Sequence, residues 1–377
     1  MKIPKTLFWI FLLFNCENLA FSEVRLPNHF QEYIKKTIMD HRIPGLSISV
    51  VKGDSLVFAK GFGVRKYGEK DSVDAQTLFQ VASVTKSFTA TLIAMLVDQG
   101  KAKWDDPVIQ HIPDFKLKDA FVANSLTIRD ALAMRSGILG GDTLKASNRK
   151  DLIRLLFDLR ISPLFRTTLT SPNCSFTIAG HIVEKIKSRR WDDILKEELL
   201  IPLQMPHTFT DISSALASTH PIAVPHIAEG GSIVPRDWEN FDLMAPADAI
   251  LSNVLDLSNW VKFQIQEGSF NNKSIVRSET IKEMQKSQAI TPDWMKDLFN
   301  PIANFSTLGL GCIVSEYKGH KIVEMWGGAE GSNALVTTMP EIKLGIVILA
   351  NLGSAFEALR AVKYYIYDIF LSAEMEN

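Results

Sequence analysis

The sequence predicts an α+β fold in which one antiparallel sheet is built from both ends of the chain, flanked by terminal helices, with a helical domain inserted between them. Two observations predict it. Strand-like alternation occurs near the beginning and again near the end of the 377-residue chain, whereas helical periodicity dominates the middle. The length suits one large or two interleaved domains and is ample for a hydrophobic core.

The two ends of the chain supply the α/β part, which we place at about 23–80 and 300–377. At the first end, a helix over 29–41 precedes a hairpin with strands over 45–51 and 55–62. At the other end, the pattern predicts four antiparallel strands and a closing helix, over 310–317, 321–326, 334–339, 344–351 and 356–371.

The middle of the chain, at about 83–300, is predicted to be the helical part. Its first helix covers 83–100, where four apolar side chains fall on one face: Phe88, Leu92, Met95 and Leu96. The clearest later helices are expected over 126–134, 152–159 and 178–200.

The first 22 residues look like a secretory signal peptide rather than a part of the fold. Lys2 and Lys5 precede an apolar run over 7–14, and Ala20-Phe-Ser22 offers small residues at the two positions that a signal peptidase reads. A short membrane anchor is the alternative, but the run is shorter than the roughly 20 residues that span a bilayer. We therefore expect cleavage after Ser22, a domain over 23–377, and a secreted or periplasmic protein without a membrane span.

Composition excludes several classes of protein. Lys and Arg number 41 against 42 Asp and Glu, so the formal net charge of −1 argues against a nucleic-acid partner. Three cysteines rule out a disulfide scaffold, and no C-x-x-C or H-E-x-x-H motif suggests a metal site, so no cofactor is expected. Behind the signal peptide, Cys174 and Cys312 either form one disulfide or are two buried thiols.

A serine nucleophile is indicated by spacing and helix context. No G-x-S-x-G is present, but S-x-x-K occurs four times, beginning at Ser49, Ser83, Ser147 and Ser315. Only Ser83 opens a predicted helix, where i and i+3 share a face, so that Lys86 can reach it. Burial favours the neutral amine of Lys86, which can then take the Ser83 proton. The alternative to a catalytic pair is a serine that only caps the helix, followed by a lysine on the surface.

The segment Phe79-Gln-Val-Ala-Ser-Val-Thr-Lys-Ser-Phe-Thr-Ala90 resembles the nucleophile motif of the serine β-lactamase and penicillin-binding-protein superfamily, on its class C and esterase side. Four more stretches are similar to family segments: Gly100–Pro107, Leu126–Gly137, Pro202–Thr208 and Gly345–Asn351. The resemblance covers nearly all of the chain after the signal peptide. It implies a β-lactamase/transpeptidase-like fold and an acyl-enzyme on Ser83 with Lys86 as the base.

The second motif of the family is usually Tyr-x-Asn, and here the sequence departs from it. Registering on Phe176 and Gly180 places Ser171 at the tyrosine position and keeps Asn173. Other branches of the superfamily use Ser-x-Asn, so Ser171 either relays a proton through its hydroxyl or only fills the gap. The resemblance implies that Asn173 donates to a substrate carbonyl and braces Lys86.

The third motif is usually Lys-Thr-Gly or His-x-Gly. Registering on the glycines at 327, 328 and 331 places Met325 at the Lys/His position, so the cation that grips a substrate carboxylate is replaced. Trp326-Gly327-Gly328 resembles the version in family VIII carboxylesterases, where the tryptophan offers an apolar wall. The glycines allow close approach of the strand, and the Gly328 N–H is expected to be the second oxyanion donor. A core tryptophan beside two turn glycines is the alternative.

These features predict a secreted serine hydrolase, esterase-like on small acyl esters. β-Lactamase or D-amino-acid peptidase activity is the enzyme alternative. A non-catalytic binding member is the other, because the Tyr and Lys/His positions are both replaced. The expected ligand is a small-molecule ester or amide, and the sequence leaves the oligomeric state open.

Overall fold

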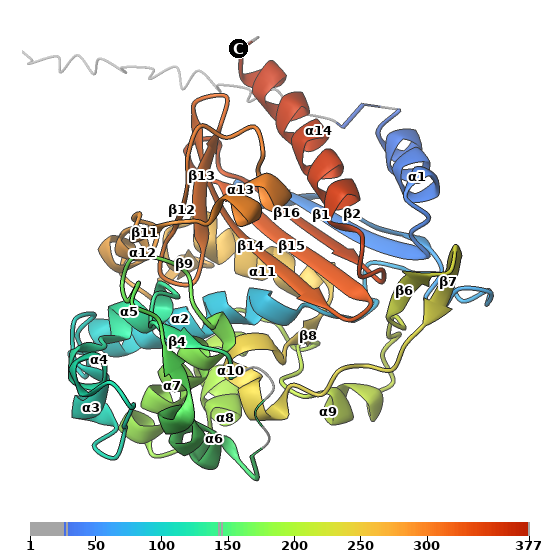
Figure 1. Ribbon diagram of the computed structural model, residues 1–377. Helices are drawn as coiled ribbons and strands as arrows, with labels where there is room; N and C mark the ends of the chain where they lie inside the picture. Colours follow the sequence, from blue (N-terminus) through green and yellow to red (C-terminus); the bar gives the residue numbers. More distant parts are fainter. Residues whose placement is uncertain (1–25, 28, 142–143, 145, 376–377) are drawn as a thin grey trace, which may run out of the picture.

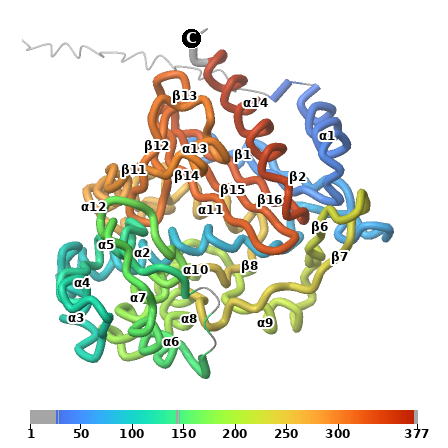
Figure 2. The backbone as a smooth tube through the Cα atoms, in the orientation of Figure 1, coloured from blue at the N-terminus to red at the C-terminus, as the bar shows by residue number. Residues whose placement is uncertain are grey.

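The computed structural model describes residues 26–27, 29–141, 144 and 146–375 (Figures 1 and 2). The predicted signal peptide over 1–22 lies outside the described residues. Within them, helices and one large antiparallel sheet confirm the predicted α+β class.

The sheet is built from both ends of the chain, as predicted. Within the described residues it has eight strands in the order β11-β12-β13-β14-β15-β16-β1-β2, and every neighbouring pair is antiparallel. The first strand of the chain pairs with the last, with Leu46 opposite Ala350. The strand bounds are β1 Gly45–Lys52, β2 Ser55–Gly63, β11 Ala289–Ile290, β12 Ser306–Leu308, β13 Ile313–Tyr317, β14 His320–Ala329, β15 Ser332–Met339 and β16 Leu344–Ala350.

Helices cover both faces of the sheet (Figure 1). On one face α14 crosses the sheet with α1 and α13 beside it, and on the other face α11 packs against β16, β1 and β15. The expected boundary at about 300 assigned α11 to the helical part, so the structure differs there. Periodicity shows that a segment is helical but not which layer its apolar face covers. The bounds of these helices are α1 Phe30–Asp40, α11 Val254–Ile265, α13 Asp293–Phe299 and α14 Phe356–Met375.

The other helices gather below the sheet, with α2 lying between them and the strands (Figure 1). The single helix expected over 178–200 is two helices, because Ser188 has a left-handed backbone (φ +53°) that ends α7 before α8 begins. The bounds are α2 Thr85–Asp98, α3 Val108–His111, α4 Ala120–Ser125, α5 Ile128–Leu132, α6 Arg149–Leu155, α7 Pro172–Lys187, α8 Trp191–Leu195, α9 Ile212–Leu216, α10 Ala245–Asp248 and α12 Ser278–Met284.

In the described part of the chain, four short two-stranded sheets lie between the strands of the large sheet that come from the two ends. They are β3 Phe79–Gln80 with β8 Leu251–Ser252, β4 Ile138–Leu139 with β5 Arg160–Ile161, β6 His226–Glu229 with β7 Ser232–Pro235, and β9 Ser269–Phe270 with β10 Lys273–Ser274.

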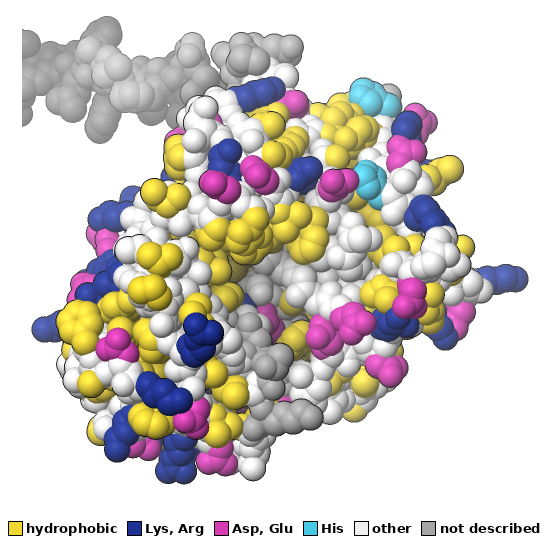
Figure 3. Space-filling view, in the orientation of Figure 1, with side chains coloured by type: hydrophobic (Ala, Val, Ile, Leu, Met, Phe, Trp, Pro, Cys, Tyr) yellow, Lys and Arg dark blue, Asp and Glu magenta, His cyan; other side chains and the backbone are white. Residues whose placement is uncertain are grey.

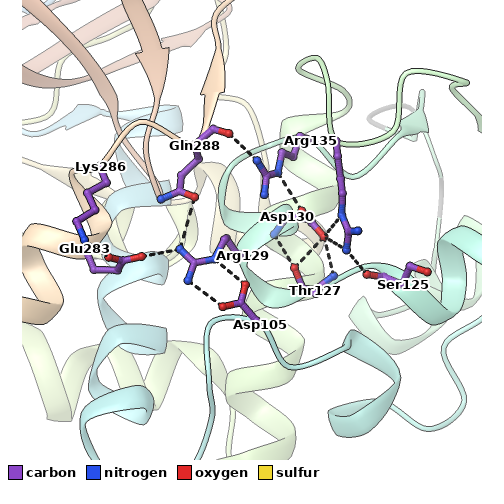
Figure 4. Close-up of polar contacts among 10 residues, drawn as sticks. Asp105, Ser125, Thr127, Arg129, Asp130, Arg135, Glu283, Lys286 and Gln288 are labelled. Carbon is purple, nitrogen blue, oxygen red and sulfur yellow. Dashed lines mark hydrogen bonds and ion pairs between the residues drawn. The ribbon is translucent and has the colours of Figure 1, made fainter.

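A network of charged side chains joins α5 to α12 and to Gln288, the residue just before the edge strand β11 (Figure 4). Arg129 of α5 donates hydrogen bonds of 2.7 Å to Asp105 and to Glu283 of α12. Arg135, just after α5, donates to the backbone oxygen of Gln288. The hydrogen bond from Arg129 lowers the pKa of Asp105, so both charges persist at neutral pH. The network therefore holds the two parts together on one side of the site described below.

The two cysteines left open by the sequence are not joined to each other in a disulfide. Cys174 of α7 and Cys312 are both buried. Burial raises the pKa of Cys312 to about 12, so this thiol stays protonated at neutral pH. Among the described residues, no helix is both long and apolar enough to cross a bilayer.

Candidate active site

Ser83 and Lys86 meet where the sequence predicts. Ser83 lies in a 3₁₀ turn, Ala82–Val84, that leads directly into α2, and Lys86 lies in the first turn of that helix. Lys86 Nζ donates to Ser83 Oγ at 2.7 Å, and the lysine is only 1 % exposed. Ala82 has a φ of +44°, a left-handed conformation that is costly for an L residue and persists only where its surroundings hold it.

Asp248, at the end of α10, is a member of the site that the sequence analysis missed. Ser83 Oγ donates to Asp248 Oδ1 at 2.8 Å, and Lys86 Nζ donates to the same oxygen at 3.0 Å. The side chain is 3 % exposed, and its other oxygen, Oδ2, is buried without a hydrogen-bond partner among the described residues. One signal was available, because this aspartate is the single charge in an otherwise apolar stretch, 243–251.

The turn of the candidate nucleophile Ser83, Ala82–Val84, is called the nucleophile turn below and packs directly against β14 at Gly327. A Cβ on this glycine would lie 1.9 Å from the backbone oxygen of Val81 and 3.2 Å from the backbone nitrogen of Ser83. Only glycine therefore permits this approach. β13 pairs with β14 only as far as Glu324, so beyond it one edge of β14 has no partner strand in the described sheet. Gly328 is exposed there, and the oxyanion role of its N–H stays a prediction.

Trp326 belongs to the core and to the site at once. The ring is 4 % exposed and stacks on Phe299, with 5.0 Å between the ring centroids. In the part of the chain that the structure describes, its Nε1 is buried without a hydrogen-bond partner, so the ring acts as apolar surface. The tryptophan is thus both a core residue and part of the site, whereas the two glycines beside it lie in β14 and not in a turn.

A cavity of about 130 Å³ lies beside Ser83 and Lys86. Met325 and Trp326 form part of its wall, and Trp294, 60 % exposed, stands at its rim. The remaining lining is apolar: Met134, Leu169, Pro172, Met295, Phe299 and Ile313. Among the described residues that line the cavity, Lys86 is the only one with a basic side chain. Figure 3 shows hydrophobic side chains gathered along the rim of a hollow between the sheet and the helical part.

Ser171 precedes α7 and has a left-handed backbone, with a φ of +30°. Its Oγ donates to the backbone oxygen of Gly140 at 2.6 Å. Within the described part of the chain, no hydrogen bond joins Ser171 to Ser83 or Lys86. This geometry fits a hydroxyl that holds a loop, and the relay role stays a prediction.

Asn173 lies in the first turn of α7, where its backbone oxygen accepts a hydrogen bond from Thr177. The hydrogen bonds of Lys86 Nζ run instead to Ser83, Ala247 and Asp248. The expected brace between Asn173 and Lys86 is therefore not seen, and contact between Asn173 and a substrate carbonyl stays a prediction.

His181 and His226 form hydrogen bonds with residues other than Ser83, Lys86 and Asp248. His181 contacts Glu184, and His226 hydrogen-bonds the backbone oxygen of Asn351. Burial lowers the pKa of His226, so its imidazole is neutral at pH 7. Within the described ranges, no group of three or more His, Cys, Asp or Glu side chains is placed to hold a metal ion.

The model of the Beta-lactamase family matches residues 28–368, which include the nucleophile turn and every strand of the sheet. The chain belongs to the Beta-lactamase family. This confirms the superfamily that the motifs around Ser83 resemble. Membership supports a serine hydrolase that works through an acyl-enzyme.

Several relatives in this family are similar over most of the chain. Unguisins hydrolase ungD' of Aspergillus campestris (strain IBT 28561) is 26% identical over 358 residues, covering 91% of this chain and 65% of the relative. Protein flp of Staphylococcus aureus (strain MW2) is 27% identical and also covered to 65%. Penicillin-binding protein 4 of Amycolatopsis lactamdurans is 28% identical over 270 residues, 69% of either chain. The chain thus spans 65% of the length of the first two relatives, which is slightly less than two thirds.

A solved structure confirms the fold. The octameric penicillin-binding protein homologue from Pyrococcus abyssi has a TM-score of 0.73 with this chain and is 26% identical in sequence. The match covers 85% of this chain and 72% of that one. The β-lactamase/transpeptidase-like architecture predicted from the motifs is therefore correct.

Proposed function

We propose that this protein is a serine hydrolase that forms an acyl-enzyme on Ser83 and hydrolyses small acyl esters. One observation carries the proposal. The Ser83 hydroxyl lies within 2.7 Å of Lys86 Nζ and 2.8 Å of Asp248 Oδ1, at the wall of an apolar cavity. A hydroxyl held by a cation and a carboxylate at a cavity wall has the arrangement of an activated nucleophile.

In the proposed reaction, Ser83 Oγ attacks the ester carbonyl and loses its proton to the buried cluster beside it. The backbone N–H groups of Ser83 and Gly328 bind the oxyanion, and the alcohol leaves as the carbonyl re-forms. Water then attacks the acyl-enzyme by the reverse route and releases the acid. The left-handed turn at Ala82 and the close approach at Gly327 support this role, because both hold the nucleophile at one position against β14.

The lining of the cavity favours an uncharged, apolar substrate. Met325 occupies the position where relatives of the penicillin-binding type place a cation. Among the described residues that line the cavity, the only basic side chain is that of Lys86, which is already bonded to Asp248. A substrate carboxylate would therefore lack a charge-assisted contact of roughly 1.5–3 kcal/mol, or about 10- to 150-fold in acylation rate. We propose esters in preference to penicillins and D-alanyl peptides for this reason.

The predicted signal peptide supports secretion or export to the periplasm, where such a hydrolase would meet small esters from outside the cell. Two other functions are outcomes of the test below. One is hydrolysis of β-lactams or D-amino-acid peptides, and the other is ligand binding without turnover.

The experiment compares kcat/KM for p-nitrophenyl butyrate and for nitrocefin on the parent protein, Ser83→Ala and Ser147→Ala. Ser147 begins another S-x-x-K sequence but lies exposed in a loop, so Ser147→Ala is the matched control. We expect the parent and Ser147→Ala to favour the ester, and Ser83→Ala to lose turnover with little change in Tm. Equal kcat/KM for the two substrates would refute the substrate class, and full activity in Ser83→Ala would refute the mechanism.

A further inference from the structure

Ser83, Lys86 and Asp248 are each hydrogen-bonded to the other two. The sequence alone suggested no role for Asp248. The three distances are 2.7 Å from Lys86 Nζ to Ser83 Oγ, 3.0 Å from Nζ to Asp248 Oδ1, and 2.8 Å from Oγ to Oδ1. A fourth contact of 3.3 Å joins Nζ to the backbone oxygen of Ala247. With Lys86 as the ammonium and Asp248 as the carboxylate of their ion pair, these four contacts account for every hydrogen of the cluster.

Each of the four contacts needs one hydrogen. An ammonium group supplies three N–H donors and has no lone pair, and a serine hydroxyl supplies one O–H donor. Lys86 Nζ faces three oxygen acceptors, those of Ser83, Ala247 and Asp248. The hydroxyl hydrogen of Ser83 then belongs to the remaining contact, with Asp248 Oδ1. In this arrangement the lysine has no site left on which to receive the serine proton.

The fold holds the carboxylate at this place. Thr89 Oγ1 of α2 donates to the backbone oxygen of Pro246, and Thr85 Oγ1 accepts from the backbone N–H of Ile250, so α2 clamps α10 on both sides of Asp248. From the opposite side α7 approaches so closely that a Cβ on Gly180 would lie 2.2 Å from the Pro246 ring. These contacts hold the backbone on both sides of Asp248, which keeps Oδ1 next to Ser83.

We infer that Asp248 is the catalytic base and that Lys86 stabilises the serine oxygen as an ammonium donor. This inference rests on the proposed function and changes which residue takes the proton. Among the described residues, Lys86 has the only charged side chain that hydrogen-bonds Asp248 or forms an ion pair with it. The base and its counter-ion are thus one isolated, buried pair with no net charge.

The proton and electrons balance through both half-reactions. When Oγ bonds to the carbonyl carbon, its proton passes to Asp248 Oδ1, and the π electrons move to the carbonyl oxygen. When the carbonyl re-forms, the bond to the alcohol oxygen breaks, and that oxygen takes the proton from Asp248. In deacylation a water gives its proton to Asp248 as it attacks, and Ser83 leaves with that proton. Throughout, Lys86 Nζ donates to Oγ and offsets its developing negative charge.

Two variants of Asp248 separate proton transfer from shape. Asp248→Asn keeps the size of the side chain but cannot accept the proton, so kcat for p-nitrophenyl butyrate should fall by about 10²–10⁴-fold with KM nearly unchanged. Asp248→Ala leaves space for a small anion. Formate should restore its activity in a saturable manner, whereas nitrate, an anion that is not a base at neutral pH, should not. Asp256→Asn is the matched control, because Asp256 is a buried carboxylate on α11 that bonds His207 and Thr208.

Each outcome decides the inference, with Tm recorded for every variant and fluorophosphonate labelling of Ser83 recorded for the parent. Loss in Asp248→Asn with rescue of Asp248→Ala by formate alone supports a base at this position. Activity in Asp248→Asn within about fivefold of the parent would overturn the inference and return the proton to Lys86. Loss without rescue, or equal rescue by nitrate, would also overturn it, because Asp248 would then serve shape or charge. A parent protein that is inactive and unlabelled at Ser83 would instead refute the proposed function itself.

Discussion

Gly327→Ala tests whether the contact between β14 and the nucleophile turn sets the reaction geometry. The new Cβ would lie 1.9 Å from the Val81 oxygen, whereas carbon and oxygen normally stay roughly 3.3 Å apart. Its three nearest neighbours, the carbonyl oxygen and carbon of Val81 and the nitrogen of Ser83, all belong to the backbone, so the strand or the turn must move by more than about 1 Å. A displacement of that size costs about 10²-fold in rate. We expect kcat/KM for p-nitrophenyl butyrate to fall by about 100-fold, or roughly 2.7 kcal/mol.

The matched control for this variant is Gly345→Ala. Its Cβ would lie equally close, 1.9 Å, but to Val261 Cγ1 of α11, away from the nucleophile turn. It should lower Tm and leave kcat/KM of the folded protein near the parent value. Steady-state kinetics and thermal unfolding of both variants provide the comparison. If Gly327→Ala keeps kcat/KM within about threefold of the parent, the contact does not position the nucleophile.

Four other experiments each test the role of one side chain. Ser171→Ala should lower the free energy of unfolding in urea by about 1 kcal/mol, through loss of the bond to Gly140, with little change in kcat; a fall in kcat of about 100-fold would instead reveal a proton relay. Met325→Lys places a cation in the cavity wall and should raise acylation by benzylpenicillin about 10- to 150-fold, read by intact-protein mass spectrometry; an unchanged rate would contradict our reason for excluding penicillins. Lys363→Met leaves the carboxylate of Glu324, its fully buried partner, without a counter-charge, and should lower the free energy of unfolding, measured with urea, by about 3–5 kcal/mol. The double variant that also carries Glu324→Gln should lose less; equal losses would contradict a buried ion pair. Because burial raises the pKa of Cys312 to about 12, this thiol is not ionised at pH 8 and should react with Ellman's reagent only after denaturation; rapid reaction of the native protein would disprove the burial.

Elements with a strong period were predicted well from the sequence. The β1–β2 hairpin, α1, α2, α14 and the strands β13 to β16 all lie where alternation or helical spacing indicated them. The edge strand β11 and its neighbour β12 were missed, because two or three residues carry no period. The expected strand over 321–326 is longer in the structure, where β14 continues through Gly327 and Gly328. Two glycines look like a turn in the sequence, yet here they keep the strand extended against the nucleophile turn.

The candidate site divides in the same way between local and distant contacts. Ser83 and Lys86 are three residues apart on a helix, so their contact follows from helical spacing alone. Asp248 lies 162 residues after Lys86, and only the packing of α10 against α2 brings them together. The hydroxyl of Ser171 depends on its left-handed backbone, which directs it to Gly140 and which no residue pattern signals. Sequence reasoning therefore predicted the contact between Ser83 and Lys86 but not Asp248, which completes the hydrogen bonds of both.

The most direct measurement of the central claim is the site of covalent labelling by a fluorophosphonate. The parent protein is incubated with the probe, digested, and the modified residue is identified by mass spectrometry. We predict a single adduct on Ser83, formed in Ser147→Ala as in the parent and absent from Ser83→Ala. An adduct on another residue, or none on a protein that hydrolyses esters, would contradict an acyl-enzyme on Ser83.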